Sequence, residues 1–205
     1  MSYTKAKIFN LALGALLLSR RITDTDTETT NEVKILNLHY DTALLATLAD
    51  LNLDSTSTQV VASLLEEDPN DLWSYSYAYP SDCAFFRRIQ TAALSDNRTT
   101  HVDKRVAIKG GVKCIFTNQT DAIFEYISTD VPIDTLSATA GLAIAYRLAS
   151  MSAPLVTGKG AKALMESIEK KYAMIKAEAQ EQDRLENFVF VAPETESEFV
   201  QARIE

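Results

Sequence analysis

The chain of 205 residues is long enough for one well-packed domain, because a chain of this size buries roughly 70% of its unfolded surface. Its apolar content of 46% and charged content of 23% are ordinary for a globular protein. The formal net charge of −8 argues against a surface that simply binds nucleic-acid phosphates, although an acidic wall would let DNA slide past it.

No run of the sequence reaches the roughly 18 apolar residues that cross a bilayer. The nearest candidate is AKIFNLALGALLLS, residues 6–19. It could be a signal peptide, but Asn10 interrupts it and residues 20–21 are arginines with no small-residue cleavage site, which favours a buried amphipathic helix. Cys83 and Cys114 are too few and too far apart for a disulfide framework or a zinc site, so we expect a reducing compartment.

The first part of the chain has helical spacing. Thr4 can cap a first helix, whose apolar face is formed by Ile8, Leu11, Ala12, Ala15 and Leu18. A polar loop at residues 23–30 precedes a second helix, whose apolar stripe is formed by Val33, Leu36, Tyr40, Ala43, Leu44, Thr47 and Leu48. Residues 53–71, LDSTSTQVVASLLEEDPND, predict a turn and then a short third helix that ends before Pro69.

The middle of the chain changes to the alternation that is typical of strands. Residues 104–117 alternate on both sides of a Gly-Gly pair at 110–111, which predicts a hairpin with a two-residue turn. Residues 122–128 and 84–90 supply two further strands. Four such strands make a small antiparallel sheet with one face that needs cover.

Helical spacing resumes at residues 133–151. Asp134 is the predicted cap, and the stripe is formed by Leu136, Ala140, Ala143, Ile144, Leu148 and Met151. We expect Pro154 and the TGKG that follows it to end this helix. A last helix over residues 159–186 has its seam at Leu164, Ile168, Tyr172, Ile175 and Ala179, and it would be roughly 40 Å long.

The sequence therefore predicts an α+β fold, mainly α. In it, a helical bundle with a long C-terminal helix has a small antiparallel β-sheet domain inserted in the middle and an extended C-terminal arm. The expected divisions are the N-terminal helices of the bundle (1–79), the β domain (80–130), the C-terminal helices (131–186) and the arm (187–205).

No enzyme signature emerges from the residues. His39 and His101 lack neighbours that would make chemistry, and Cys83 lacks a basic group that would activate it, so packing or solvent-exposed roles are favoured. The acidic residues 66–68 belong to the predicted helix end. GKGAK at 158–162 lacks the spacing of a phosphate-binding loop. We therefore expect no catalytic residue, no metal ligand and no cofactor.

One basic concentration stands out in the sequence. It is formed by Arg98, Lys104, Arg105, Lys109 and Lys113. It fits a solvated hairpin, and it also fits a surface that contacts a partner or the DNA backbone.

An aromatic-rich run precedes the predicted sheet. WSYSYAYPSDCAFFRRI resembles the W-x-Y-x-Y-x-Y-P-x-D-C-x-x-x-R-R-I motif of the head-to-tail adaptor proteins of tailed phages, also called tail tubular protein A or the head-completion adaptor of short-tailed phages. The matching positions are Trp73, Tyr75, Tyr77, Tyr79, Pro80, Asp82, Cys83, Arg87, Arg88 and Ile89.

Other segments are similar to the same family. Residues 8–33 resemble its opening helix and acidic loop, residues 113–158 its sheet-to-helix passage, and EFVQARIE at 198–205 its C-terminal ending. The family's R-x-x-L-L-x-x-x-x-W-x-F-A segment corresponds here to residues 42–57, which contain no Trp or Phe.

The resemblance implies a structural virion protein that catalyses no reaction. Family members form a ring of about twelve copies beneath the portal protein. The ring extends the channel for double-stranded DNA without reading its sequence, closes the head after packaging and presents a platform for the tail or nozzle protein. The expected location is the neck or tail of the virion, assembled in the host cytoplasm, with no membrane partner.

The resemblance also implies roles for named residues. In the C-terminal arm, Phe199, Ala202 and Arg203 would dock on the portal, with Phe199 as the apolar anchor and Arg203 pairing with a carboxylate or carbonyls. At the expected junction of helix and sheet, the aromatic rings would fasten the two parts together; these residues are Trp73, Tyr75, Tyr77, Tyr79, Pro80 and Asp82. Pro80 would fix the backbone and Asp82 would cap the turn.

Three alternatives remain open on the sequence. One is another neck or tail-completion (stopper) protein of a phage. The second is a helical intracellular enzyme, which would need ionisable residues converging on a pocket. The third is a DNA-binding regulator, against which the pI of about 4.9 argues.

Overall fold

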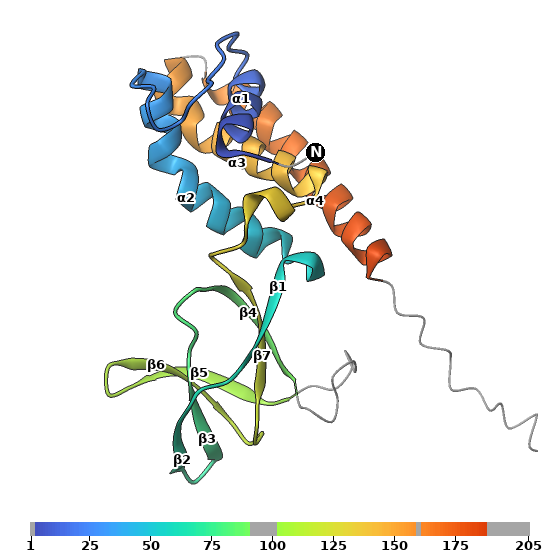
Figure 1. Cartoon of the computed structure of the whole chain (residues 1–205). Coiled ribbons are helices and arrows are strands. Elements are labelled where there is room, and N and C mark those ends of the chain that lie inside the picture. Colours follow the sequence, from blue (N-terminus) through green and yellow to red (C-terminus); the bar gives the residue numbers. More distant parts are fainter. Residues whose placement is uncertain (1–2, 91–101, 159–160, 188–205) are drawn as a thin grey trace, which may run out of the picture.

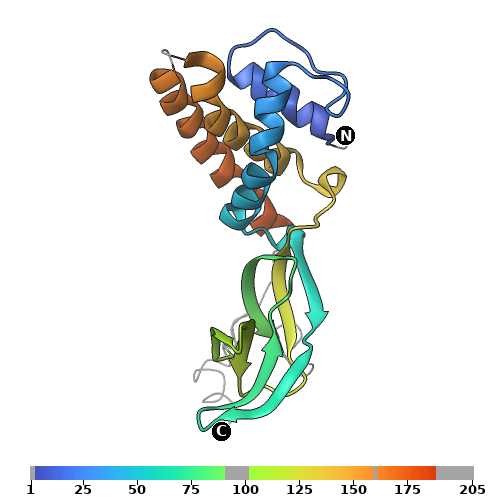
Figure 2. The same ribbon diagram turned by 90° about the vertical axis from the view of Figure 1, so that its left-hand side faces the viewer.

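The structure is a computed structural model, and it describes residues 3–90, 102–158 and 161–187. The helices gather at one end of the molecule and the strands at the other, so that the protein is elongated in both views (Figures 1 and 2). The N-terminus lies with the helices.

The described residues form four α-helices. They are α1 (Lys5–Ala15), α2 (Asn31–Leu51), α3 (Ala138–Thr157) and α4 (Ala161–Glu186). The other three helices all pack against α3, and its small residues allow the close approach: a Cβ on Gly141 would lie 2.6 Å from the ring of Tyr3. Among the described residues, no helix is both long enough and apolar enough to cross a membrane.

The strands form two antiparallel sheets. Sheet A has the order β1-β7-β4 and sheet B the order β2-β3-β6-β5. The strands are β1 (Ser57–Val61), β2 (Leu64–Asn70), β3 (Trp73–Ala78), β4 (Cys83–Gln90), β5 (Lys104–Lys109), β6 (Val112–Thr117) and β7 (Ile123–Ser128). The chain passes from sheet A to sheet B at residues 62–63 and returns at residues 79–82, so the two sheets share one strand region, residues 57–128.

Two apolar cores hold the molecule together. The larger lies among the helices and includes Ile127 of β7, which joins it to the strands. The smaller lies between the two sheets and is centred on Phe124, whose ring makes edge contacts with Tyr77 at 5.9 Å and Phe86 at 5.1 Å. Because Ile127 and Phe124 both lie on β7, this strand contacts the core among the helices and the core between the sheets.

Several elements predicted from the sequence are confirmed. Thr4 caps α1 by accepting a hydrogen bond from the Lys7 N–H at 3.2 Å. All seven predicted stripe positions of α2 are buried. The turn between β5 and β6 falls on Gly110 and Gly111, whose φ values of 58° and 82° favour glycine. The long last helix also exists, with Ile168, Tyr172 and Ala179 buried along it.

The predicted fold class, a helical bundle that carries one small inserted sheet, is wrong. The protein is a mixed α+β fold in which seven strands of the described chain form two sheets. The error lies in residues 57–78: the first strand begins at Ser57, ahead of the boundary expected at residue 80, and the predicted third helix is β1 and β2. The apolar residues 60, 61, 64 and 65 have helical spacing, but the chain crosses between sheets at residues 62–63, so these side chains lie on exposed edge strands.

The predicted N-cap of α3 and the predicted effect of Pro154 are wrong, whereas the helix does end at the start of the TGKG, as expected. Its N-cap is Ser137, which accepts from the Ala140 N–H at 3.2 Å, whereas Asp134 lies in the preceding 3₁₀ turn (Ile133–Thr135). Pro154 lies inside the helix, which continues to Thr157 and ends at Gly158 with φ of 62°. A proline removes one donor and kinks a helix, but it does not end it when the surrounding packing holds the next turn.

Candidate functional site

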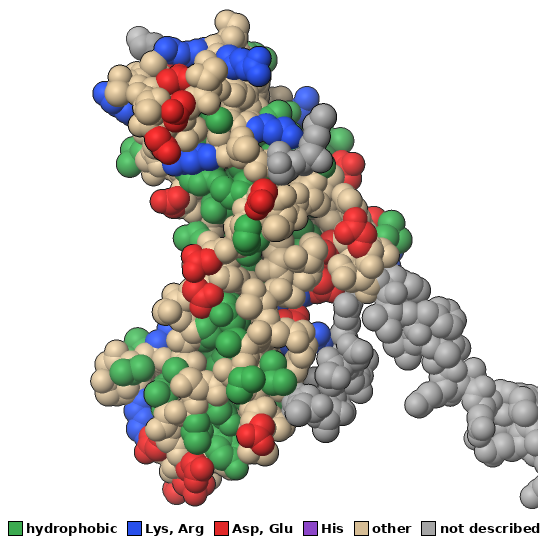
Figure 3. Space-filling model, viewed as in Figure 1, with side chains coloured by type: hydrophobic (Ala, Val, Ile, Leu, Met, Phe, Trp, Pro, Cys, Tyr) green, Lys and Arg blue, Asp and Glu red, His purple; other side chains and the backbone are tan. Residues whose placement is uncertain are grey.

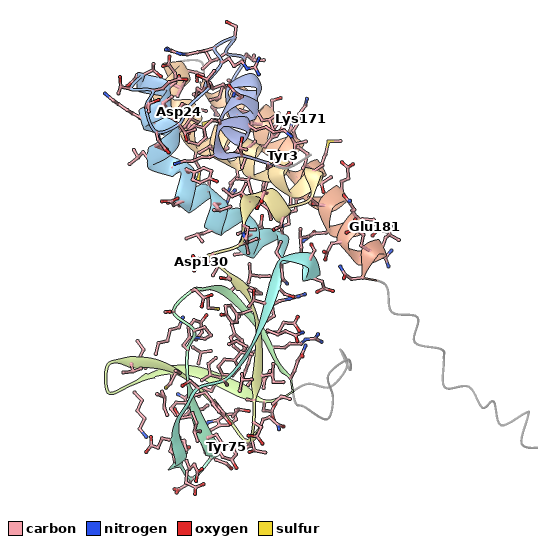
Figure 4. The ribbon with its side chains drawn as sticks, viewed as in Figure 1. Tyr3, Asp24, Tyr75, Asp130, Lys171 and Glu181 are labelled. Carbon is pink, nitrogen blue, oxygen red and sulfur yellow. The ribbon has the colours of Figure 1, made fainter. Side chains whose placement is uncertain are left out.

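The first part of the aromatic motif lies within the strand region. Trp73, Tyr75 and Tyr77 are on β3, and Tyr75 is at the end of the molecule away from the helices (Figure 4). Tyr77 is buried between the sheets and donates from its hydroxyl to the Gln119 carbonyl at 3.1 Å. The prediction that these three rings fasten the helices to the strands is wrong, because the segment before them is a strand and not a helix.

Residues 79–82 form the crossing from sheet B to sheet A. The Tyr79 N–H donates to the Lys113 carbonyl at 3.2 Å, and the Cys83 N–H donates to the Pro80 carbonyl at 3.3 Å. The Lys113 ammonium lies 3.4 Å from the centre of the Tyr79 ring. Tyr79 and Pro80 therefore fix the turn that joins the two sheets.

Asp82 lies where β7 leaves the strands for the helices. Its carboxylate accepts hydrogen bonds from the Ser128 hydroxyl at 2.7 Å and the Tyr126 hydroxyl at 2.9 Å, and its carbonyl accepts from the Thr129 N–H at 2.7 Å. The bond from Ser128 and then the bond from Tyr126, against the opposing effect of burial, hold the pKa of Asp82 below its usual value. Burial and then the neighbouring Asp82 raise the pKa of Tyr126 to about 12.

The two arginines of the motif meet a buried carboxylate. Glu125 on β7 is 2% exposed and accepts from Arg87 Nη1 at 2.9 Å and Arg88 Nε at 2.8 Å, and it also accepts from Gln90. The other end of the Arg87 guanidinium pairs with Asp54, which follows α2. A buried charge is tolerated only when it is paired and hydrogen-bonded, and Glu125 meets that condition.

The same cluster is tied to the last helix. The carboxylate of Asp183 on α4 accepts from the Asp54 N–H at 2.6 Å and the Ser55 N–H at 3.0 Å. The backbone N–H of Asp54 therefore binds α4, while the side chain of Asp54 binds Arg87. We call this set the tie: Asp54, Arg87, Arg88, Glu125 and Asp183. A hollow of about 500 Å³ lies beside it, lined by Asn52, Asp54, Phe85, Arg87, Arg88 and Glu125.

A second polar contact joins α4 to α2 farther up the helix. The Asp50 carboxylate accepts from the Tyr172 hydroxyl at 2.7 Å and from the Lys176 ammonium. Burial alone would raise the pKa of Asp50, but the bonds from Lys176 and Tyr172 outweigh burial and hold that pKa below its usual value. Gln180 donates to the Leu51 carbonyl at 3.0 Å, so the C-terminal half of α4 is held to the end of α2 by polar groups.

Sequence reasoning missed most of the tie. The motif contains Arg87 and Arg88, but no role followed for them from the residues alone. Asp54, Glu125 and Asp183 are far apart in the sequence, and no spacing connects them. An acidic residue inside the apolar run AIFEYIS, Glu125, was the one available signal, since a charge is buried in a strand only when it has a partner.

Most of the basic residues singled out in the sequence contact other residues of the same chain. Lys104 donates to the Arg87 carbonyl at 2.7 Å, Lys109 pairs with Glu66, and Lys113 lies over Tyr79. Burial lowers the pKa of Lys104. Arg105 is exposed and has no partner among the described residues, and Arg98 lies outside them. Figure 3 shows basic side chains scattered over the strands, with no continuous basic face on that side.

The remaining residues considered in the sequence are the histidines, the cysteines and the residues of the arm. His39 is half-buried on α2, and its Nε2 atom has no hydrogen-bond partner there. Cys83 and Cys114 are free thiols, and burial raises the pKa of Cys83. The described ranges hold no group of three or more His, Cys, Asp or Glu side chains that could bind a metal ion. His101 lies outside the described residues, as do the arm residues Phe199, Ala202 and Arg203.

The arrangement is suited to holding two parts of a molecule together. Asp54, Arg87, Arg88 and Glu125 form ion pairs with one another, and the Asp183 carboxylate is held by N–H groups. Comparison with models of known protein families finds no family that matches the chain, and comparison with curated proteins finds no match either.

Proposed function

We propose that the chain is a subunit of a phage head-to-tail adaptor, a ring between the portal and the tail that extends the DNA channel and closes the head after packaging. The proposal rests on where three residues of the motif lie in the structure. Asp82, Arg87 and Arg88, three of the positions that resemble the adaptor family, lie where the helices meet the strands and fix that passage.

An adaptor subunit needs a rigid connection between its helices and its strands. Its two ends bind different partners, the portal above and a tail or nozzle protein below, so force on one end must reach the other without unfolding the subunit. The elongated shape gives two separate ends (Figure 2). The tie joins α2, α4 and sheet A by charge-assisted hydrogen bonds, which are roughly twice as strong as neutral ones.

The charge of the chain supports the same function. DNA that passes through a channel of net negative charge is not held by phosphate contacts, and the net charge is −8. The basic side chains of the strand region do not contradict this, because most of the described ones are paired inside the fold. Double-stranded DNA is thus a passing partner that the protein does not read.

The arm is the proposed portal contact. The last described residue of this part of the chain is Asn187, which donates to the Asp183 carboxylate at 3.2 Å. Phe199 and Arg203 would bind the portal, and the many copies of a ring would add their weak contacts together.

The test is co-sedimentation of the purified chain with DNA-filled, tailless capsids. We expect about twelve copies to bind per particle, the number that the resemblance to the adaptor family implies, arranged as a closed ring. A chain that ends at Asn187 should not bind, nor should Phe199→Ala with Arg203→Ala, whereas the control Thr195→Ala with Ser197→Ala should bind like the full-length chain. Binding to assembled tails and not to capsids would instead favour a tail-completion protein.

A further inference from the structure

Among the described strands that lie at the edge of a sheet, β1 differs from the others. The edge strands are β1, β4, β2 and β5. Proteins usually give such edges a charge, a proline or an irregular register, because a flat bare edge pairs with other extended chains. β4 has register shifts and carries Arg87, β2 has register shifts and contains Pro69, and β5 carries Lys104. β1 has none of these features: its five residues are uncharged and pair with β7 in an unbroken register.

The outer edge of β1 is open among the described residues. The side chains of residues 58–61 are exposed, and Val61 is 74% exposed. The strand order of sheet A places no described strand on the side of β1 away from β7. Figure 2 shows β1 (cyan) along the outside of the strands. Its outward N–H and C=O groups can therefore bind one further strand.

The C-terminal end of α4 lies beside the start of β1. The Asp183 carboxylate accepts from the Ser55 N–H at 3.0 Å, and Ser55 is two residues before β1. Asn187, one helical turn after Asp183, donates to the same carboxylate at 3.2 Å. Both views place the end of α4 next to the beginning of β1 (Figures 1 and 2). Because residue 188 is bonded to Asn187, it starts within a few residues' length of Ser57.

The five residues that follow Asn187 have the composition of a strand. They are FVFVA, residues 188–192, with two aromatic and two β-branched side chains and with no charge, glycine or proline. Pro193 comes next, and it has no N–H to donate to a ladder. Residues 193–205 then contain four Glu and one Arg. The arm thus has an apolar part that matches β1 in length and lack of charge, followed by an acidic part.

We infer that residues 188–192 add to sheet A as a further strand along the outer edge of β1 in the same chain. The added strand runs parallel to β1, because both segments begin at the helical end of the molecule. A parallel strand beside antiparallel ones makes a mixed sheet, which is common. The strand comes from the same chain because Asn187 is held beside β1, which gives it a higher effective concentration there than the arm of another copy has.

The pairing divides the arm into two parts. Residues 188–192 are held on β1, while residues 193–205 stay unpaired and carry Phe199 and Arg203. Thirteen extended residues span at most roughly 45 Å. This last step alone rests on the proposed function: sheet A would then fix the point from which Phe199 and Arg203 reach the portal.

The test is residue-resolved amide hydrogen exchange on the full-length chain. The variant is Val189→Pro with Phe190→Pro, since one of two successive residues in a strand must donate toward β1. In the wild type, the amides of residues 188–192 that face β1 should exchange at least about tenfold more slowly than in a free peptide of the same sequence. In the variant, the outward amides of residues 57–61 should exchange at least about tenfold faster than in the wild type.

Two controls show that any change is local. Amides of residues 36–48 in α2 should keep the wild-type rate in the variant, which shows that the fold is intact. Val200→Pro with Gln201→Pro places the same two prolines in the second part of the arm, and it should leave residues 57–61 unchanged. A synthetic peptide of residues 187–197, added to the first variant at about 1 mM, should restore slow exchange in β1, whereas the same peptide with both prolines should not.

Three results would overturn the inference. The first is exchange of residues 188–192 in the wild type at the rate of the free peptide. The second is a β1 whose exchange the prolines do not change. The third is slow exchange that appears only as the protein concentration rises, because the strand would then come from the arm of another copy.

Capsid binding separates this inference from the proposed function. If residues 188–192 exchange slowly as expected but the wild-type chain does not bind capsids, the adaptor function fails and the added strand stands. If the wild-type chain binds capsids while residues 188–192 exchange like the free peptide, the added strand is wrong and the adaptor function stands.

Discussion

Arg87 and the buried Glu125 form a part-buried ion pair on neighbouring strands, with Nη1 of Arg87 2.9 Å from Oε1 of Glu125. The pair is more than a contact within sheet A, because the same guanidinium holds Asp54 after α2, and the backbone of Asp54 is held by Asp183 of α4. A group of paired charges therefore lies where an apolar core would otherwise have to continue. Its energy depends on every partner being present, since an unpaired buried charge is costly.

Removing Arg87 should therefore destabilise the protein strongly. Arg87→Met keeps part of the apolar stem but leaves Glu125 with only Arg88 and Gln90 as partners. We expect a loss of about 2–4 kcal/mol in the free energy of unfolding, measured with urea at neutral pH. Arg105→Met is the control, and its change should stay within about 0.5 kcal/mol. Equal effects of the two substitutions would show that the tie does not stabilise the fold.

The Asp82 carboxylate should make stability depend on pH in acid. Its folded pKa lies below the ordinary value, so its contribution is present above about pH 4 and is lost as the pH falls through the folded pKa. Asp82→Asn should be less stable than the wild type at neutral pH, and the difference should shrink as the pH falls. The exposed Asp134→Asn is the control, and it should follow the wild type at every pH. A constant difference for Asp82→Asn would contradict the assignment.

The tie should also set the local stability of the end of α4. Asp183→Ala leaves the Asp54 and Ser55 N–H groups without their acceptor. We expect amide hydrogen exchange in residues 176–187 to become at least about tenfold faster, while residues 161–172 keep the wild-type rate, because apolar packing holds that half. Glu178→Ala, an exposed change on the same helix, should alter neither half. Unchanged exchange in residues 176–187 would mean that other contacts hold the end of the helix.

The parts of the fold that follow from local chemistry could be predicted from the sequence. Thr4 and the Gly110-Gly111 turn each act on residues a few positions away, and the stripe of α2 repeats over many turns. The prediction of a helix in residues 57–70 was wrong because the helical spacing of Val60, Val61, Leu64 and Leu65 is a coincidence. A crossing between the two sheets separates the two pairs. The preference for strands in Ser-Thr-Gln-Val-Val was the better signal.

The tie could not be predicted, for a different reason. Its members come from the end of α2, from β4, from β7 and from α4, and only the packed fold brings them together. The motif that resembles the adaptor family pointed to the right stretch of chain, and Asp82 of the predicted junction lies where β7 ends, but the predicted aromatic rings on β3 do not lie at that junction. Its aromatic residues Trp73 and Tyr75 pack among the strands, whereas Asp82 and Arg87 meet the passage to the helices.

Gly141 on α3 should tolerate no side chain, although Ala is ordinarily the better helix former by roughly 0.5–1 kcal/mol. A Cβ there would lie 2.6 Å from the ring of Tyr3, and that ring is fixed by a hydrogen bond from its hydroxyl to the Ala138 carbonyl at 2.8 Å. Gly141→Ala should therefore lower the free energy of unfolding by about 1–3 kcal/mol, measured by urea denaturation. Gly14→Ala is the matched control, because nothing lies within 4 Å of its Cβ position in α1, and it should be neutral or stabilising. In a Tyr3→Ala background the cost of Gly141→Ala should disappear, since the clash is then gone; a cost that persists would place its origin in the backbone of α3.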